Sequence, residues 1–342
     1  MRSRGTWLSV LVGALLLVGP YLTFVFELDK VSIEPGITLD VVAGAKVGGR
    51  TDHPAQGRVL LAAVGVTRGL SPWDAFKGWL DPKTDVHATR DVYGDASATQ
   101  AREQSAEDMV DSKSVAMIVA GRRIGLEPKG QGVRVTQGFP GLPASSILKA
   151  GDVITAVNGT ALCLVGDARA ALTNGKPGES VALGVRRQGK GAVTVVPVVL
   201  GHEPTTGRGI IGVALESLRC QAPFTADVDT GPVIGPSAGL AITLAIVDRL
   251  TPGELTGGAA VATTGTIEAD GSVGPVGGVK QKTHAVRAAG AKLFLVPAEE
   301  YLEAKKHAGQ MRVEPVRNLN DALAAIATLP GAIPLPPEAS LT

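Results

Sequence analysis

The chain has 342 residues, too long for a single average domain and suggestive of about two. Hydrophobic residues make up 44% of it, which is enough for packed cores and excludes a wholly disordered chain. The 33 Lys and Arg residues are balanced by 32 Asp and Glu residues, so no basic surface is expected, which argues against a role in binding nucleic acid.

Near the N-terminus, residues 6–26 carry no charged side chain. A helix of this length spans the roughly 30 Å hydrocarbon core of a bilayer, so the segment is predicted to be a transmembrane anchor. Two arginines precede it and two acidic residues follow it, which places residues 1–5 in the cytoplasm and the rest of the chain outside. A cleaved signal peptide is the alternative, but its apolar region is normally shorter and ends in a small-residue site. A buried core helix of this length rarely lacks charges.

Residues 27–120 are predicted to form an N-terminal extracytoplasmic region with few clear signals. Short β-like runs occur at 38–42 and 58–64, and a polar stretch follows. The segment 101–120 has a helical pattern with apolar residues on one stripe. No residue of this region is a candidate for catalysis.

Residues 121–200 have the pattern of a compact β-rich module. Its expected elements, in chain order, are strands at 133–136 and 152–157, a helix at 167–172, and strands at 181–187 and 193–198. Asn158-Gly159 lies between the first pair and the helix, and this dipeptide is a hairpin-type turn signal.

The run PASSILKAGDVITAVNG from Pro143 to Gly159, together with the later KPGESVALGVRR, resembles bacterial protease-associated PDZ domains. PDZ domains bind a peptide as an added strand at a sheet edge, and N–H groups of a loop face its C-terminal carboxylate. The resemblance implies protein or peptide substrates as partners. It places the substrate-binding loop at Ile124, Gly125 and Leu126. The alternative is a PDZ-like fold that only docks or spaces other parts.

Residues 205–330 alternate between strand and helix patterns, which predicts an α/β domain, and residues 331–342 are predicted to be a flexible tail. The expected strands are at 210–215, 259–267, 273–276 and 292–296, and the expected helices at 237–250, 280–289, 299–307 and 320–328. The fold class is therefore predicted to be α+β and multidomain, with a transmembrane helix, a β-rich PDZ domain and an α/β domain.

Ser237 is the candidate nucleophile of this domain, in the pentapeptide GPSAG. It begins a helix that is apolar nearly all round, where unpaired N–H groups and the helix dipole can stabilise an oxyanion. The pentapeptide also fits the G-x-S-x-G elbow of serine hydrolases. In a chain with 44 glycines that match is weak, and a serine at a helix start is by default a cap.

Lys282 is the candidate base. It follows the uncharged, glycine-rich segment GPVGGV. Burial in an apolar pocket lowers the pKa of a lysine, so that the neutral amine can accept a proton. Lys280 is expected to point to another side of the same helix and to remain solvated. A histidine base is the alternative, since His284 and His307 lie downstream of the serine. However, His284 lies inside a helical pattern, and no HGGG-type segment precedes Ser237.

Two long runs, GPSAGLAITLAIVDRLTPGELTGG and ATTGTIEADGSVGPVGGVKQKTHAVRAAGAKLFLVPAEE, resemble the proteolytic domain of Lon-type (S16-like) serine proteases. In that family, the serine of P-S-A-G and the lysine of G-G-x-x-x-K form a Ser–Lys dyad. The resemblance places this dyad at Ser237 and Lys282. It gives Thr264 the role of orienting the lysine amine. An anchor, a PDZ domain and this domain in that order resemble a family of membrane-anchored bacterial PDZ–Lon peptidases.

The chain departs from Lon proteases in two places. Ile234 occupies the position three residues before the serine, where Lon proteases often have Asp, which keeps open a non-catalytic PDZ/Lon-like scaffold. The chain also lacks the ATP-binding motif G-x-x-x-x-G-K-[S/T], so neither ATP nor another cofactor is expected. The five histidines are scattered without an H-E-x-x-H motif, so no metal site is expected.

The sequence therefore predicts an ATP-independent, membrane-anchored serine endopeptidase whose PDZ domain recruits substrates outside the cytoplasm. Homo-oligomers are implied only by the resemblance to Lon proteases, which often form rings. Cys163 and Cys220 form either a disulfide or two buried small apolar side chains, because an exported chain permits the first and two cysteines do not require it.

Overall fold

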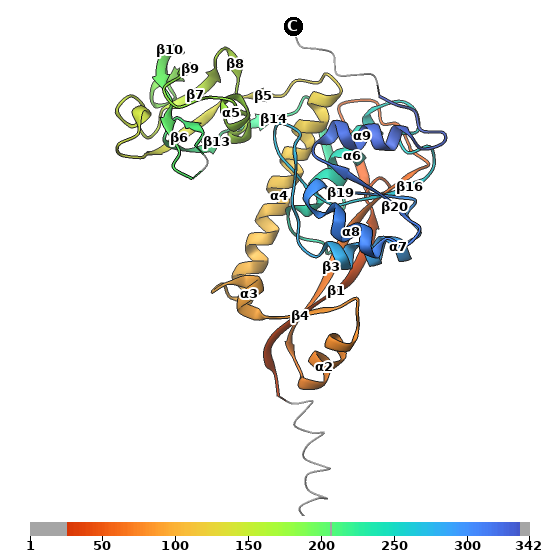
Figure 1. Ribbon diagram of the computed structural model, residues 1–342. Helices are drawn as coiled ribbons and strands as arrows, with labels where there is room; N and C mark the ends of the chain where they lie inside the picture. Colours follow the sequence, from red (N-terminus) through yellow and green to blue (C-terminus); the bar gives the residue numbers. More distant parts are fainter. Residues whose placement is uncertain (1–25, 206, 336–342) are drawn as a thin grey trace, which may run out of the picture.

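The computed structural model describes residues 26–205 and 207–335 (Figure 1). Residues 6–25 of the predicted anchor and residues 336–342 of the predicted tail lie outside the described residues. Within the described ranges, no helix has both the length and the apolar character needed to cross a bilayer.

A mixed six-stranded sheet forms the centre of the larger unit, in the order β20-β19-β16-β3-β1-β4. Its strands are β1 (Leu28–Asp40), β3 (Arg58–Leu70), β4 (Asp85–Ala88), β16 (Ala260–Thr263), β19 (Leu293–Pro297) and β20 (Arg312–Val316). The pairs from β3 to β20 are parallel, and β1 is antiparallel to both β3 and β4. All five residues of β19 are buried, as expected for a parallel strand covered on both faces.

The strands β1 and β3 come from the region 27–120, which the sequence predicted to be separate from the domain at 205–330. That separation is wrong for these strands, because β3 pairs in parallel with β16, with Val59 opposite Val261. The physical reason is that β3 is apolar on both faces and needs a layer on each side. The N-terminal region therefore completes the sheet of the C-terminal domain.

Helices cover both faces of this sheet (Figure 1). One face packs α4 (Ala98–Arg123), α6 (Gly239–Leu250) and α9 (Leu319–Ala327), and the other packs α7 (Val279–Ala288) and α8 (Tyr301–His307). Alternate residues of β3 enter the two cores: Val59 and Leu61 join the first, Leu60 and Ala62 the second. The α6 helix is buried along most of its length, which agrees with its continuous apolar sequence.

Smaller elements complete this unit. They are β2 (Ala45–Gly48) paired with β15 (Thr225–Val228), β17 (Thr266–Ile267) paired with β18 (Val273–Gly274), the helices α2 (Pro72–Leu80) and α3 (Thr89–Tyr93), and the 3-10 turns η3 (Pro236–Ala238) and η4 (Ala298–Glu300).

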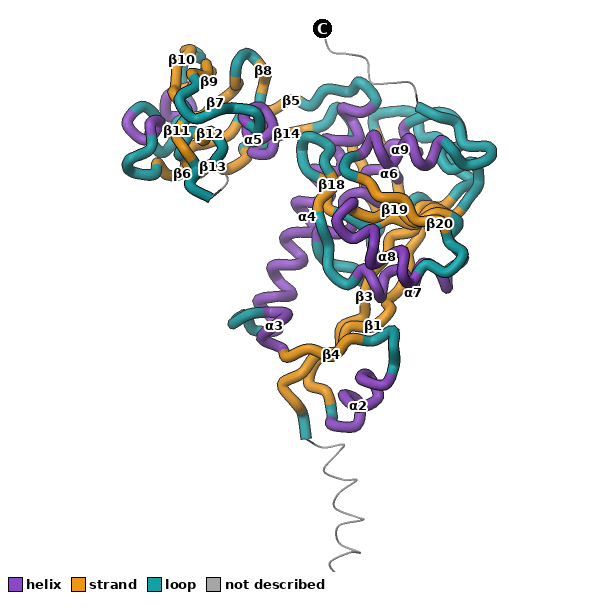
Figure 2. Tube along the Cα trace, viewed as in Figure 1, coloured by secondary structure: helices purple, strands orange, loops and turns teal. Residues whose placement is uncertain are grey.

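A second, smaller sheet has its own core and lies to one side of the larger unit (Figure 2). Its strand order is β10-β9-β7-β6-β13, with β8 paired to β7. The elements are β6 (Val133–Gly138), η1 (Pro143–Ser146), β7 (Val153–Val157), β8 (Thr160–Ala161), α5 (Val165–Leu172), β9 (Ser180–Arg186), η2 (Arg187–Gly189), β10 (Thr194–Val199) and β13 (Val213–Ser217). The sequence assigned the strand at 210–215 to the C-terminal domain. That assignment is wrong, since Leu215 pairs with Val135 of β6.

The paired strands β5 and β14, together with a disulfide, join the small sheet to the larger unit. Strand β5 (Lys129–Gly130) pairs with β14 (Cys220–Gln221), while β11 (Gly201–His202) pairs with β12 (Gly209–Ile210) nearby in the chain. Cys163 and Cys220 form a disulfide with a Cα–Cα distance of 5.2 Å. The small sheet is thus inserted between α4 and β15, both of which pack in the larger unit.

Candidate active site

Ser237 lies in the 3-10 turn η3, which leads directly into α6. The turn is approached through Gly235, whose φ of +103° is accessible to glycine but not to most residues. Two contacts from α4 hold this approach: the Gly235 N–H donates to Ser105 O at 2.9 Å, and Ser112 Oγ donates to Pro236 O at 3.3 Å. The helix from the N-terminal region therefore fixes the position of the candidate nucleophile.

The same turn is bonded to the end of β16. The Gly265 N–H donates to Ser237 O at 3.1 Å, and the Leu240 N–H donates to Gly265 O at 3.1 Å. The sequence predicted one strand over 259–267, but the chain leaves the extended conformation at Gly265, where φ is +148°. This break separates β16 from β17. It also brings the residue before it, Thr264, next to the turn that carries Ser237.

Lys282 extends from the first turn of α7, which begins after Gly278 in the left-handed conformation. A Cβ atom at Gly278 would lie 2.6 Å from Val64 Cγ1, so glycine allows α7 to start against β3. The lysine side chain is only 3% exposed, and its Nζ donates to Thr264 Oγ1 at 2.9 Å. Thr264 is fully buried, and its N–H donates to Leu295 O in β19 at 3.1 Å.

Burial lowers the pKa of Lys282 from 10.5 to about 8, because the interior solvates the ammonium form poorly. The carboxylate of Glu300 opposes this effect by favouring the charged lysine. Glu300 ends η4, and its Oε1 accepts from the Val276 N–H at 3.1 Å in the approach to α7. With a pKa near 8, a substantial fraction of the amine is neutral at mildly alkaline pH and able to accept a proton.

The three site residues predicted from the sequence thus converge. Lys282 contacts Thr264, and the residue after Thr264 is bonded to Ser237. The histidines of the alternative triad do not join them. The ring of His284 lies beside that of His307, with centroids 5.1 Å apart and planes tilted by 48°, and His307 Nε2 lies 3.1 Å from Glu303 Oε1. The geometry therefore favours the lysine as the base.

The predicted carboxylate-binding loop is not available for that role. The N–H groups of Ile124 and Leu126 both donate to Gly121 O, at 3.1 and 2.8 Å, and the Gly125 N–H donates to Arg122 O at 3.0 Å. These bonds close the C-terminus of α4, and Gly125 adopts the positive φ of a helix-ending glycine. Placing a peptide carboxylate at Ile124, Gly125 and Leu126 was therefore wrong.

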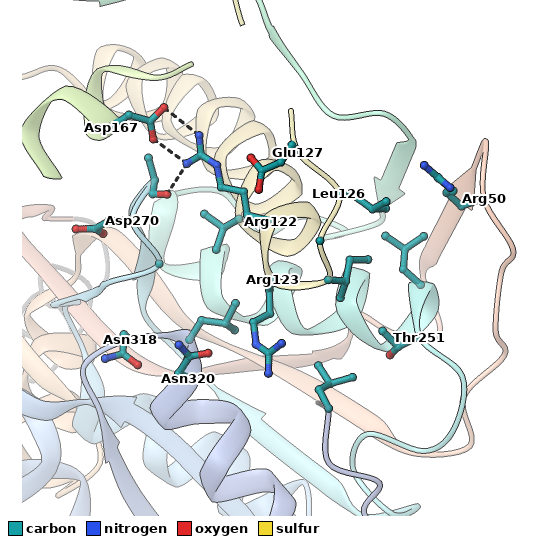
Figure 3. A pocket seen from close by; sticks show the side chains of 18 of the residues that line it. Arg50, Arg122, Arg123, Leu126, Glu127, Asp167, Thr251, Asp270, Asn318 and Asn320 are labelled. Carbon is teal, nitrogen blue, oxygen red and sulfur yellow. Dashed lines mark hydrogen bonds and ion pairs between the residues drawn. The ribbon is translucent and has the colours of Figure 1, made fainter. Parts of the chain in front are cut away.

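These residues instead line a cavity of about 1530 Å³ between the end of α4, α5 and the loops beside α9 (Figure 3). Arg122 points across it to Asp167, with Nη1–Oδ1 and Nη2–Oδ2 distances of 2.7 and 3.0 Å, and also donates to Ala269 O at 2.9 Å. Ser237, Thr264 and Lys282 are not part of its lining. The cavity marks the junction of the two units and lies apart from the candidate dyad.

The sequence predicted a strand at 210–215 but not its position at the edge of the small sheet. Strand β13 ends the order of the small sheet, so one of its edges has no partner strand among the described residues. Strand β13 follows the segment Gly209-Ile210-Ile211-Gly212. At the C-terminal end of the strand, Ser217 Oγ accepts from the Val165 N–H at the start of α5, at 2.9 Å. The available signal was the glycine-flanked apolar run before an alternating strand.

Comparison with known proteins identifies both units. Residues 227–328 match the model of the Lon protease (S16) C-terminal proteolytic domain, and residues 120–198 match that of the PDZ domain. Lon protease 1 of Myxococcus xanthus is 40% identical over 96 residues, and Lon protease of Escherichia coli (strain K12) is 34% identical over 96 residues. Each alignment covers 27% of this chain and 12% of the relative, so the chain spans a small part of these relatives' length.

Among solved structures, the PDZ domain of an SdrC-like protein from Listeria monocytogenes is 25% identical, covering 25% of this chain and 90% of that domain with a TM-score of 0.23. The identification of the PDZ domain rests on the family match rather than on this likeness. The chain therefore carries a PDZ domain followed by the C-terminal proteolytic domain of the Lon (S16) serine peptidases.

Proposed function

We propose that the protein is an ATP-independent, membrane-anchored serine endopeptidase that uses Ser237 as nucleophile and Lys282 as general base. One observation carries this proposal. The buried amine of Lys282 is hydrogen-bonded to the Thr264 hydroxyl, and the N–H of the next residue, Gly265, is hydrogen-bonded to the Ser237 carbonyl. A lysine is rarely buried without an ion-pair partner, so its burial here indicates a function. A lysine with a lowered pKa can act as the general base for a serine held at the start of a helix.

The reaction begins when neutral Lys282 takes the proton of Ser237 Oγ, which then attacks the carbonyl carbon of a peptide bond. The N–H groups of Gly239 and Leu240 already donate to Pro236 O and Gly265 O. Donors to the oxyanion therefore come from the turn before them, from Ser237 and Ala238. Protonated Lys282 gives its proton to the leaving amine. Water then hydrolyses the acyl-enzyme, with Lys282 again accepting a proton and returning it to Ser237 Oγ.

Thr264 is assigned a positioning role. Its hydroxyl holds Lys282 Nζ at 2.9 Å, and its own backbone is bonded to β19. A long flexible side chain loses rotamer freedom when it is fixed in this way, so the threonine keeps the amine close to the serine turn before substrate arrives.

The PDZ domain is proposed to recruit a protein C-terminus or an exposed strand. A peptide would add to the open edge of β13, which offers a row of backbone N–H and C=O groups beside α5. The segment Gly209-Ile210-Ile211-Gly212 precedes this strand and takes the place of the loop predicted at 124–126. The Gly209 N–H already donates to Gly175 O at 3.0 Å, so the backbone of Ile211 and Gly212 would face the peptide's carboxylate.

A location outside the cytoplasm is supported by two features. The uncharged segment 6–26 is long enough to cross a bilayer, with the arginines on its N-terminal side. The disulfide between Cys163 and Cys220 is typical of oxidising compartments. Since such compartments lack ATP and the sequence has no ATP-binding motif, the substrates are proposed to be unfolded or flexible segments.

The test uses the full chain in detergent micelles with an unfolded reporter protein as substrate. We expect Ser237→Ala and Lys282→Ala to abolish cleavage, because each removes a group that must act in the same step. The matched control is Lys280→Ala on the same helix. Lys280 pairs with Asp85 at 2.7 Å instead of entering the site, so this variant should retain most of the activity.

Three outcomes would contradict the proposal. Cleavage that survives in Lys282→Ala but is lost in His284→Ala would replace the dyad with a histidine mechanism. Cleavage that requires added ATP would contradict the ATP-independent mechanism. Failure of the parent chain to cleave any unfolded substrate, with retained binding to C-terminal peptides, would favour a non-catalytic scaffold, the alternative suggested by Ile234.

A further inference from the structure

The helix α2 displays large apolar side chains that nothing in the described chain covers. None of its nine residues is buried, and the exposed fractions are 45% for Trp73, 48% for Phe76, 77% for Trp79 and 59% for Leu80. The whole chain has three tryptophans, and two of them lie in this helix. Such a concentration of exposed aromatic surface indicates an interaction site.

These side chains share one face, which points away from the protein body. At about 100° per residue, the four apolar residues fall within an arc of about 120°. Gly78 lies on the opposite side and packs on β4, since a Cβ atom there would lie 2.9 Å from Val86 Cγ2 and 3.3 Å from Thr84 Cγ2. Trp73 and Phe76 stack with ring centroids 5.8 Å apart. The glycine side therefore faces the protein and the aromatic face looks outward.

The helix is held firmly in this position. Ser71 caps its N-terminus, with Oγ accepting from the Asp74 N–H at 3.1 Å, and the Asp81 N–H closes its C-terminus on Lys77 O at 3.0 Å. Because the caps and the contact with β4 fix the helix, its aromatic face is displayed in a defined direction.

The location of α2 identifies its partner. Leu28 at the start of β1 pairs with Leu70 at the end of β3, and α2 begins two residues after Leu70 (Figure 1). Glu27 lies against Gly69, where an added Cβ atom would be 3.1 Å from its Oε2. The helix thus starts beside the point where the chain leaves the uncharged segment 6–26. A bilayer crossed by that segment would meet α2 within a few residues.

We propose that the aromatic face of α2 lies in the headgroup region of the bilayer that residues 6–26 enter; this rests on the proposed membrane anchor. Tryptophan suits this position, because its ring is apolar while its N–H needs a polar partner. An interfacial helix buries its apolar face about 5–10 Å into the boundary between headgroups and acyl chains. Together with the anchor, α2 gives the proteolytic domain two points of attachment and so one orientation relative to the membrane.

The experiment measures tryptophan fluorescence of the full chain in phosphatidylcholine nanodiscs. In Trp7→Phe, the remaining tryptophans are Trp73 and Trp79, so the emission reports α2 alone. We expect blue-shifted emission that is lost with lipids carrying a nitroxide at the headgroup or upper acyl chain. A nitroxide at the end of the acyl chain should cause a smaller loss, because an interfacial helix does not reach that depth.

Two control variants separate this inference from the anchor itself. Trp73→Tyr with Trp79→Tyr leaves Trp7, which reports insertion of residues 6–26. Leu302→Trp in a background without the native tryptophans places the fluorophore on α8, where the replaced side chain is 72% exposed, and its emission should resist quenching. All three variants change exposed or N-terminal positions, so folding is expected to be retained.

Quenching of Trp7 without quenching of Trp73 and Trp79 would overturn the inference while leaving the anchor intact. Cross-linking of α2 to α2 in that case would assign the aromatic face to a second copy of the chain. Absence of quenching for Trp7 as well would refute the anchor, and with it the orientation proposed for α2. Equal quenching of the Leu302→Trp protein would show non-specific adsorption and would also overturn the assignment.

Discussion

The Lys282 side chain can act as a base because its surroundings solvate the ammonium form poorly. Burial alone would push the amine toward the neutral form, while the carboxylate of Glu300 limits that shift. The Thr264 hydroxyl can hydrogen-bond to Lys282 whether the amine is charged or neutral, since a hydroxyl both donates and accepts. Burial and the charge of Glu300 therefore set how much neutral lysine exists at a given pH.

This arrangement predicts how cleavage depends on pH. Only the neutral amine accepts the serine proton, so kcat/KM should rise as the pH increases through about 8 and then level off. At pH 7 about a tenth of the lysine is neutral. Removing a negative charge disfavours the ammonium form, so Glu300→Gln should lower the pKa of Lys282 and move the profile to lower pH.

The measurement is a pH–rate profile for both proteins, with Glu299→Gln as the matched control. Glu299 is the exposed neighbour in the same turn, and its replacement should leave the profile in place. A profile of Glu300→Gln that moves to higher pH would contradict the assignment of Lys282 as the base.

Sequence motifs are sufficient to propose the site residues, but they do not show how the fold changes the chemistry of those residues. Ser237, Lys282 and Thr264 follow from sequence runs long enough to indicate Lon-type domains. The lowered pKa depends on burial of the amine in the folded unit, which no motif contains. The error at Ile124 and Leu126 has a similar origin: a glycine before a strand fits a PDZ loop, but the same glycine also ends a helix, and the long α4 decides between them.

At the scale of elements, the start of α6 is placed by close backbone packing. A Cβ atom at Gly239 would lie 2.8 Å from the Ile267 N, 2.9 Å from Ile267 Cγ2 and 2.9 Å from Ser112 Oγ. Glycine therefore lets α6 approach both β17 and α4, which keeps the Ser237 turn against Gly265. The apolar sequence patterns predicted the helix and the strand, but the distance between the two elements depends on residues far away in the chain.

Gly239→Ala should therefore weaken both the fold and the site. The methyl group has to displace backbone at Ile267, a change that typically costs about 1–3 kcal/mol. We expect a lower free energy of unfolding in denaturant titrations and a larger loss of cleavage than the unfolding alone explains. Gly277→Ala is the control, because its Cβ atom would meet nothing within 4 Å and its φ is ordinary. Equal stability of the two variants would contradict the packing argument.

At the scale of the whole molecule, the PDZ domain is an insertion in the proteolytic unit. The chain leaves that unit after α4 and returns at β15, and the excursion is closed by the β5–β14 pair and the disulfide. Arg122 adds an ion pair from α4 to Asp167 of the PDZ domain. The sequence predicted the PDZ strands between 133 and 198, whose contacts are close in the chain. It predicted neither the edge position of β13 nor the insertion, because pairing between β3 and β16 joins distant segments.

The disulfide should stabilise the inserted PDZ domain mainly by restricting the conformations of its unfolded chain. It joins cysteines that are 57 residues apart, and closing a loop of that size is worth up to about 4 kcal/mol in the chain-entropy model. The double variant Cys163→Ser, Cys220→Ser should therefore lower the unfolding midpoint of the PDZ domain, measured by calorimetry. Its cleavage of short peptides that do not need the PDZ domain should be retained. An unchanged midpoint would show that the crosslink does not constrain the unfolded chain.

The pairing of β3 with β16 also determines when the proteolytic site first exists. Synthesis proceeds from the N-terminus, so β1, β3 and the whole PDZ domain are made before Ser237 is. Thr264 acquires its backbone partner only when Leu295 of β19 has been made. The contacts proposed to position Ser237 and Lys282 therefore form only after the last part of the chain has folded back onto its first. An incomplete chain would therefore be inactive, because the proposed nucleophile and base are not yet held together.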